Sequence, residues 1–233
     1  MFKTKPTRST AKAEATQTRI LDVALDLFRR RGFDQTTMRE IATQADVSLG
    51  SAYYYFDSKE DLVMAFYERA GVEIGQRIAT GLAGSKTVEE RLRVILAAKF
   101  DYFLPNRAFL GALFRHAADP QNRLSPFSDE TAHIREQDQG FFRLALEAKS
   151  GGIDVPKDLA PHLPKMLWLY QMGLILFWIY DRAPQQRRTH ALREKSLALL
   201  LSSLKLASFA LLRPLRTRII DLLLTAEGEA PNV

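Results

Sequence analysis

The sequence predicts an all-α fold, with a small helix-turn-helix domain at the N-terminus and a larger helical domain after it. Apolar residues recur three and four positions apart through most of the chain, and no stretch alternates as a strand would. Glycine and proline divide this pattern into segments of helical length. A chain of 233 residues, 46% of them hydrophobic, is long enough for a small domain and a medium-sized one.

The chain begins with a basic segment and a first helix. Residues 1–13 are rich in Lys, Arg, Ser and Thr, and we expect a flexible basic arm there. Its cations could follow DNA phosphates, although a plain solvated tail explains them equally well. Residues 14–31 carry apolar side chains at helical spacing, and Gly32 is expected to end this helix.

Residues 36–59 predict two short helices joined by a tight turn. Thr37 and Glu40 fit a capping box, so the first of these helices should start at Thr37. Ser48 can cap the second helix, which we expect to run from Leu49 to Tyr55. Successive residues of a helix lie about 100° apart, so at least one of its three consecutive tyrosines must face solvent or a partner.

A pair of short helices with small residues and exposed hydroxyls suits the DNA major groove. Small residues allow close approach, while hydroxyls, helix N-terminal N–H groups and cations bind phosphate oxygens. We expect Arg39, Leu49, Gly50 and Ala52 to discriminate between bases. The alternative is a helical hairpin whose tyrosines simply lie at the surface. The candidate DNA-binding residues are Thr37, Arg39, Ser48, Leu49, Gly50, Ala52, Tyr53, Tyr54, Tyr55 and Lys59.

Residues 16–66 resemble the DNA-binding domain of the TetR (tetracycline-repressor-like) family of bacterial regulators. The sequence departs from the family at Asp46, where the family usually has glycine, and we expect aspartate to adopt the left-handed conformation of this turn. The resemblance implies that Tyr53, Tyr54 and Lys59 face DNA. The matching residues are Ile20, Ala24, Leu27, Phe28, Gly32, Phe33, those from Thr36 to Ala42, Ala45, those from Val47 to Phe56, and those from Ser58 to Leu62.

The rest of the chain predicts six more helices, separated mostly by glycine or proline. The first of them begins beside the helix-turn-helix and would act as a lever toward the next domain. The predicted helices lie near residues 58–80, 87–104, 107–118, 128–149, 158–182 and 186–224. We expect a DNA-binding domain at 14–60, an effector-binding and dimerisation domain at 61–225, and a flexible tail at 226–233.

The last two predicted helices are apolar on most faces and therefore need partners on more than one side. The resemblance implies that they pair with their copies in a four-helix homodimer interface. The alternative is a monomer whose core absorbs them, but a helix-turn-helix usually reads two half-sites, which favours the dimer. A charge at Leu204 should then dissociate the dimer or unfold it.

Aromatic residues are frequent between residues 96 and 178. Such residues at helical spacing most often form plain core, but together they could line an apolar cavity with a few polar groups. The resemblance implies that this cavity receives a small apolar effector that releases the DNA. The candidate ligand-binding residues are Phe100, Phe103, Phe114, His116, Phe141, Trp168, Tyr170, Gln171 and Trp178.

Composition and motifs argue against several other classes of protein. The net charge of +6 fits a nucleic-acid partner. The sequence has no cysteine, no paired histidines at metal-ligand spacing and no phosphate-loop or nucleophile motif, so we expect no enzyme, metal site or cofactor. The apolar run at 166–180 is shorter than the roughly 20 residues of a membrane span, and no signal peptide is evident, so we expect a cytoplasmic protein without a membrane segment.

These observations predict a homodimeric, DNA-binding transcriptional regulator. The favoured hypothesis is a repressor that a small apolar effector releases from a palindromic operator. The alternative is an architectural or partner-recruiting DNA-binding protein that responds to no small molecule.

Overall fold

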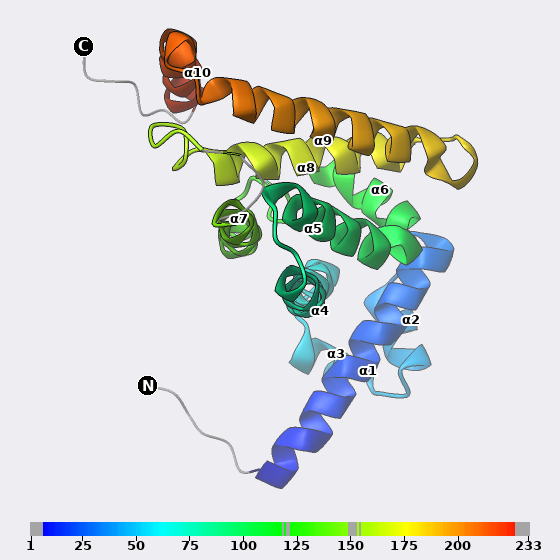
Figure 1. Ribbon diagram of the computed structural model, residues 1–233. Coiled ribbons are helices and arrows are strands. Elements are labelled where there is room, and N and C mark those ends of the chain that lie inside the picture. The colour runs from blue at the N-terminus through cyan, green and yellow to red at the C-terminus, as the bar shows by residue number, and fades with distance from the viewer. Residues whose placement is uncertain (1–6, 118, 120–121, 149–152, 154, 227–233) are drawn as a thin grey trace. The chain divides into compact units, whose positions relative to one another are not determined.

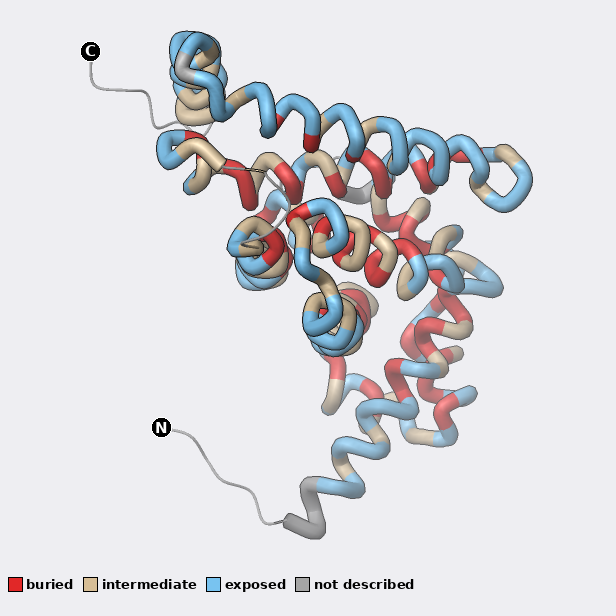
Figure 2. Tube along the Cα trace, viewed as in Figure 1, coloured by how far each residue is buried: buried red, intermediate tan, exposed pale blue. Residues whose placement is uncertain are grey.

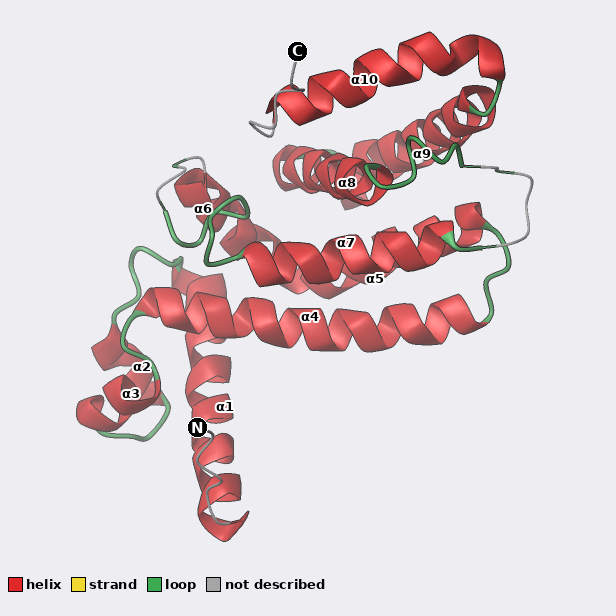
Figure 3. Cartoon of the chain, turned by 90° about the vertical axis from the view of Figure 1, so that its left-hand side faces the viewer, coloured by secondary structure: helices red, strands yellow, loops and turns green. Residues whose placement is uncertain are grey.

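The computed structural model describes residues 7–117, 119, 122–148, 153 and 155–226, and every regular element within them is helical (Figures 1 and 3). The all-α prediction is therefore confirmed. The α-helices are α1 (Thr7–Arg31), α2 (Met38–Gln44), α3 (Leu49–Tyr55), α4 (Lys59–Ala83), α5 (Val88–Phe103), α6 (Arg107–Ala117), α7 (Ala132–Leu146), α8 (Leu163–Tyr180), α9 (Arg187–Ala207) and α10 (Arg213–Ala226). Short 3-10 helices lie at η1 (Leu104–Asn106), η2 (Pro184–Gln186) and η3 (Ala210–Leu212).

The described helices divide into two compact units. The N-terminal unit comprises the described residues of Met1–Val72 and Phe103–Ile134, and the C-terminal unit those of Glu73–Tyr102 and Arg135–Val233. The described residues of 103–134 thus pack with the N-terminal helices, although they fall within the domain expected at 61–225. Helix α4 is continuous through the boundary between the units.

Phenylalanine side chains fill the centre of the N-terminal unit. Phe28 of α1 stacks on Phe109 of α6 with 5.2 Å between ring centroids, and it lies equally close to Phe33. Phe66 of α4 meets Phe109 edge-on at 5.6 Å. Full burial of such a side chain contributes about 1.5–3 kcal/mol, so these rings tie α1, α4 and α6 together. Helix α1 in turn packs against α2.

Helix α1 begins at Thr7, so residues 7–13 of the expected flexible arm are helical. The expected start at residue 14 was wrong because the earlier turns carry no apolar face to signal them. They do contain good helix formers, among them Ala11, Lys12 and Ala13, whose low conformational cost extends the helix into solvent.

Gly32 ends α1, as predicted, in the left-handed region of backbone space. Its φ is 91°, and its N–H donates to the Phe28 carbonyl at 3.0 Å. A Cβ at Gly32 would meet no atom within 4 Å, so Gly32→Ala introduces no clash. The variant changes only how readily the backbone adopts this positive φ. We expect this variant to lower the free energy of unfolding by about 1 kcal/mol in urea denaturation.

Gly50→Ala is the matched control in the same unit. Gly50 lies inside α3, and a Cβ there would also meet nothing within 4 Å. Alanine is the better helix former, so this variant should be more stable by up to about 1 kcal/mol. A loss of similar size in both variants would contradict the backbone explanation for Gly32.

Helices α8 and α9 lie side by side in the C-terminal unit (Figures 1 and 3). Helix α8 buries a broad face that includes Trp168 and Trp178, whereas α9 buries mainly Leu197, Leu201 and Leu204. Most of the surface of α9 is therefore exposed in the single chain (Figure 2). Within the described residues, no helix is long and apolar enough to cross a bilayer.

The helix expected at 186–224 was wrong, because η3 breaks it into α9 and α10. Pro214, the second residue of α10, is the signal that the prediction overlooked. Proline is tolerated in a first turn, but inside a continuous helix it would clash with the carbonyl of the fourth residue before it. Arg216 holds the break by donating to the Ala207 carbonyl and by pairing with Asp158 at 3.1 Å.

Helices α7 and α8 begin later than predicted, at Ala132 and Leu163. Before α7, the hydroxyls of Ser128 and Thr131 donate to backbone carbonyls at 3.0 and 2.7 Å. Such local bonds compete with helical ones, so the chain forms turns where the apolar pattern alone predicted a helix.

Candidate nucleic-acid interface and effector region

The helix-turn-helix begins with a complete capping box on α2. Thr37 Oγ1 accepts a bond from the Glu40 N–H at 3.2 Å, and the Glu40 carboxylate accepts one from the Thr37 N–H at 2.9 Å. The predicted capping box is confirmed, with Thr37 as the cap and α2 itself beginning at Met38. The backbone bond from Thr37, helped by its hydroxyl and by Arg31, lowers the pKa of Glu40. The ionised Glu40 therefore stabilises the folded state at a pH above the pKa that it has in the unfolded chain. This contribution is lost as the pH falls through the lower pKa of the folded state.

Asp46 forms the turn between α2 and α3 with a φ of 52°. Its N–H donates to the Thr43 carbonyl at 3.2 Å, and the Val47 N–H donates to the Ala42 carbonyl at 3.0 Å. These two bonds make a Schellman motif that closes α2. The expectation that aspartate adopts the left-handed conformation here is confirmed, and the motif fixes the direction in which the chain leaves α2.

Helix α3 presents two of its three tyrosines to solvent. Its cap is Ser48, whose Oγ accepts the Ser51 N–H at 3.0 Å, as predicted. Tyr53 and Tyr54 are 45% and 72% exposed. Tyr55 is half-buried and meets the Tyr54 ring edge-on with 5.2 Å between centroids. The two exposed phenols are therefore the ones available to a partner.

Ala52 is fully buried, and its assignment as a base-reading residue was wrong. Its methyl group lies on the inner face of α3, where the small side chain allows close packing of the helix-turn-helix. The other candidates for base reading remain accessible, with Gly50 and Arg39 exposed and Leu49 half-buried. Arg39 makes no side-chain hydrogen bond or ion pair within the described residues, so its guanidinium is available to a ligand.

Lys59 has a structural role that the sequence did not predict. Its Nζ donates to the Phe33 carbonyl at 2.8 Å and lies 4.6 Å from the centroid of the Phe33 ring. The side chain thus joins the start of α4 to the loop after α1. Lys59→Ala is therefore expected to lower the stability of the fold, since this bond and the cation–π contact disappear together.

The structure brings only part of the predicted effector region together. Within the C-terminal unit, Phe100 of α5 meets Trp178 of α8 edge-on with 5.5 Å between centroids. Tyr170 is half-buried, and its hydroxyl bonds to Ser196 of α9 at 2.8 Å. Phe141 of α7 is half-buried, and Trp168 and Gln171 are buried on α8.

The remaining candidates lie elsewhere. Phe103 and Phe114 belong to the N-terminal unit, where both are half-buried and Phe103 lies 6.3 Å from the Phe66 ring. The side chain of His116 is outside the described residues. The nine predicted ligand-binding residues therefore do not form one cluster within either unit.

A buried ion pair between Lys99 and Asp138 was missed by the sequence analysis. Lys99 is 5% and Asp138 7% exposed, and their charged atoms are in direct contact. The burial of Lys99 could have been predicted, because this residue falls on the face of α5 defined by Leu92, Ile95 and Leu96. Its partner lies 39 residues away, and sequence spacing does not indicate such a pairing.

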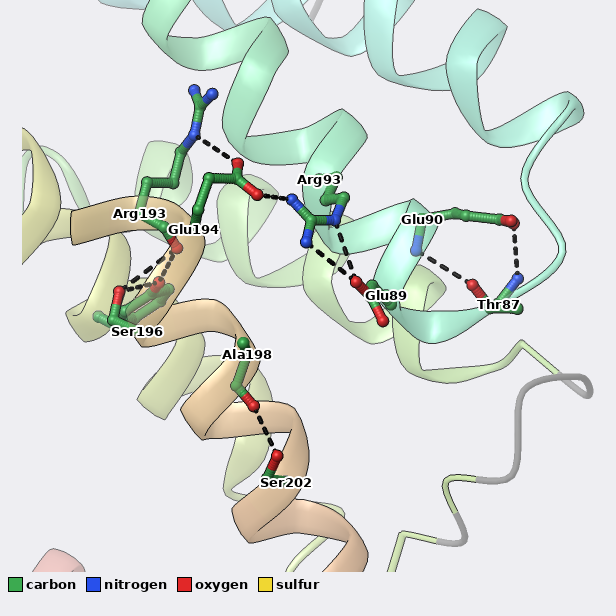
Figure 4. A network of polar contacts seen from close by, with 10 residues as sticks. Thr87, Glu89, Glu90, Arg93, Arg193, Glu194, Ser196, Ala198 and Ser202 are labelled. Carbon is green, nitrogen blue, oxygen red and sulfur yellow. Dashed lines mark hydrogen bonds and ion pairs between the residues drawn. The ribbon is translucent and has the colours of Figure 1, made fainter. Parts of the chain in front are cut away.

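A charged network links α5 to α9 at the surface of the C-terminal unit (Figure 4). The Arg93 guanidinium bonds to Glu89 at 3.0 Å and to Glu194 of α9. The bond that Arg93 donates to Glu194, helped by the charge of Arg193 and opposed by burial, lowers the pKa of Glu194. Exposed pairs of this kind contribute little stability singly, so the network mainly fixes where α9 lies along α5.

Two protein-family models match the N-terminal and the C-terminal parts of this chain. A family model described as bacterial regulatory proteins, tetR family, matches residues 20–66. A second model, described as the tetracyclin repressor-like C-terminal domain, matches residues 91–221, which is more than half of the chain.

Three individual relatives match this chain over different lengths and at 26–35% identity. The regulator TtgR of Pseudomonas putida is 26% identical over 182 residues, covering 74% of this chain and 84% of the relative. The repressor KstR2 of Rhodococcus jostii is 35% identical over 88 residues, covering 36% of this chain and 43% of the relative. The uncharacterized regulator YerO of Bacillus subtilis is 32% identical over 108 residues, covering 45% and 37%. The chain therefore spans less than half the length of the last two.

Solved structures show the same fold at low sequence identity. A TetR regulator from Nitrosomonas europaea superposes with a TM-score of 0.62 at 17% identity, covering 78% of this chain and 96% of that one. The fatty acid degradation regulator FadR from Bacillus halodurans superposes with a TM-score of 0.59 at 18% identity, covering 85% and 97%. The two family models and the shared fold agree, and the chain belongs to the TetR family of bacterial regulatory proteins.

Proposed function

We propose that this protein is a transcriptional repressor that binds an operator in double-stranded DNA through the exposed face of α3 and the start of α2. The observation that carries this proposal is a helix-turn-helix with both helices capped and with Tyr53, Tyr54 and Arg39 exposed. Hydroxyl and cationic groups on such a surface bind phosphates, and an arginine can read a guanine edge. The net charge of +6 supports the same partner.

We also propose a homodimer formed by α8 and α9. Large apolar side chains remain exposed on both helices, at intervals of seven residues along α9 and mostly along one side of α8. A second copy would cover both sets of side chains in a four-helix interface, and a dimer matches a palindromic operator. The exposed residues are Leu169, Leu176, Phe177 and Tyr180 on α8, and Leu192, Leu199 and Leu206 on α9.

The C-terminal unit is the proposed receptor for a small effector. Effector binding would favour a state that does not bind DNA, with a typical coupling of about 1–3 kcal/mol between the two sites. By reciprocity, operator DNA must weaken effector binding by the same factor. The competing function, an architectural DNA-binding protein without an inducer, predicts that no compound binds with different affinity in the presence of operator.

Selection of genomic fragments by the purified protein, followed by footprinting, tests the DNA-binding proposal. We expect protection of a palindromic site. In Arg39→Ala, the preference at one base of each half-site should relax by about 1–3 kcal/mol, because a bidentate guanine contact is lost. Binding isotherms to operators with single-base changes measure this effect.

Lys86→Ala is the charge-matched control, because Lys86 is exposed and lies in the C-terminal unit, outside the helix-turn-helix. It removes one positive charge without altering α2 or α3 and should leave base preference unchanged. If Arg39→Ala weakens binding to all sequences equally, then Arg39 contacts phosphate, and the salt slope should fall by about 0.9. No footprint from the wild-type protein on any fragment would contradict the proposed function itself.

A further inference from the structure

Three polar side chains from three helices meet in the interior of the C-terminal unit. They are Lys99 of α5, Asp138 of α7 and Gln171 of α8, which are 5%, 7% and 1% exposed. The Lys99 ammonium pairs with one oxygen of Asp138, and Gln171 Nε2 donates to the other oxygen at 3.4 Å. Both oxygens of the carboxylate are thereby engaged.

One polar atom of this cluster has no partner. A carboxylate only accepts hydrogen bonds, so the amide nitrogen of Gln171 must face Asp138, and its oxygen must point elsewhere. Gln171 Oε1 is buried and accepts no hydrogen bond from any described residue. Buried acceptors in native proteins are nearly always satisfied, so this oxygen requires a donor from a ligand or a buried water.

The surroundings of Gln171 define what kind of donor fits. Trp168 lies one turn before Gln171 and Trp178 two turns after it on the buried face of α8, and Phe100 packs edge-on against Trp178. A ligand that reaches Oε1 would therefore approach the helix face that carries these two indole rings. The formal charges of Lys99 and Asp138 cancel, and each already has a partner, so the cluster offers no free counter-ion to a charged ligand.

We propose that Gln171 Oε1 is the specificity contact of the effector site, and that it accepts a hydrogen bond from a hydroxyl or N–H group on a neutral, largely aromatic ligand. This inference rests on the proposed function and narrows the effector class from apolar compounds in general to neutral hydrogen-bond donors. An analogue without the donor leaves Oε1 desolvated and unpaired, and therefore binds more weakly.

A matched series of aromatic fragments tests the inference on the full chain. Biphenyl-4-ol carries a donor, 4-methoxybiphenyl replaces it with an acceptor, and biphenyl-4-carboxylate adds a negative charge. Affinities are measured by titration calorimetry and by ligand-observed NMR up to the solubility limit of each fragment. We expect biphenyl-4-ol to bind at least about tenfold more tightly than either of the other two.

Gln171→Met removes the amide and keeps a flexible side chain of similar length. In this variant the preference for biphenyl-4-ol over 4-methoxybiphenyl should fall to within about twofold, while 4-methoxybiphenyl still binds. Gln76→Met is the matched control, because Gln76 is exposed on α4, and it should keep the wild-type preference. Thermal unfolding of each variant shows whether its fold is retained.

Several results would overturn the inference and leave a buried water as the partner of Oε1. These are equal affinity for the alcohol and the ether in the wild type, tighter binding of the carboxylate, an unchanged preference in Gln171→Met, or no binding by any fragment. Operator binding is measured on the same samples without fragment. A protein that binds its operator but shows no donor preference disproves this inference alone, whereas a donor preference without operator binding disproves the proposed function alone.

Discussion

Lys99→Met is expected to lower the free energy of unfolding by about 3–5 kcal/mol, because it leaves the Asp138 carboxylate buried without its cation. Both residues are almost inaccessible, at 5% and 7% exposure, so solvent cannot take over the role of the lost partner. Urea denaturation followed by far-UV circular dichroism measures the change.

The double variant Lys99→Met/Asp138→Leu tests whether the instability of Lys99→Met comes from the unpaired carboxylate. Replacement of a buried ion pair by apolar residues of similar size is often neutral or stabilising, so the double variant should recover most of the stability lost in the single one. Gln171 would then lose its acceptor as well, so a residual loss of about 1 kcal/mol is expected. A double variant as unstable as the single one would show that the pair itself contributes net stability.

Leu199→Glu is expected to convert the proposed homodimer into a folded monomer. Leu199 is 69% exposed in the single chain, so a carboxylate is tolerated there, whereas in a four-helix interface the same charge would be buried without a partner at a cost of several kcal/mol. Sedimentation velocity at micromolar concentration measures the change in mass. Operator affinity should fall with it, because two half-sites are no longer bound together.

Two further variants distinguish assembly from folding. Leu204, the position chosen from the sequence, is only 5% exposed and packs with Leu159 and Leu163, so Leu204→Glu should unfold the C-terminal unit instead of dissociating a dimer. Val72→Glu makes the same change at an exposed residue of α4, 58% accessible, and should leave the mass unchanged. A wild-type protein that sediments as a monomer would contradict the proposed interface.

The local features of the helix-turn-helix could be predicted from the sequence because they depend on short-range chemistry. The capping box of Thr37 and Glu40, the Ser48 cap and the left-handed Asp46 each involve residues within a few positions of one another. The burial of Ala52 could not be predicted in the same way, because small residues suit both a close packing contact and a close DNA contact.

Features that depend on distant partners could not be predicted. The Lys99–Asp138 pair joins residues 39 positions apart, and Lys59 bonds to a carbonyl 26 positions before it. The break between α9 and α10 is a different case, since Pro214 marks it locally. A continuous apolar pattern on both sides of that proline masked the signal.

The placement of the two tryptophans has a spectroscopic consequence. Trp168 and Trp178 are the only tryptophans of the chain, and both are buried on α8 of the C-terminal unit, while the N-terminal unit carries the consecutive tyrosines of α3. Indole fluorescence excited selectively therefore originates in the C-terminal unit alone. A change in this emission when operator is added would therefore report on the C-terminal unit and not on α3 itself.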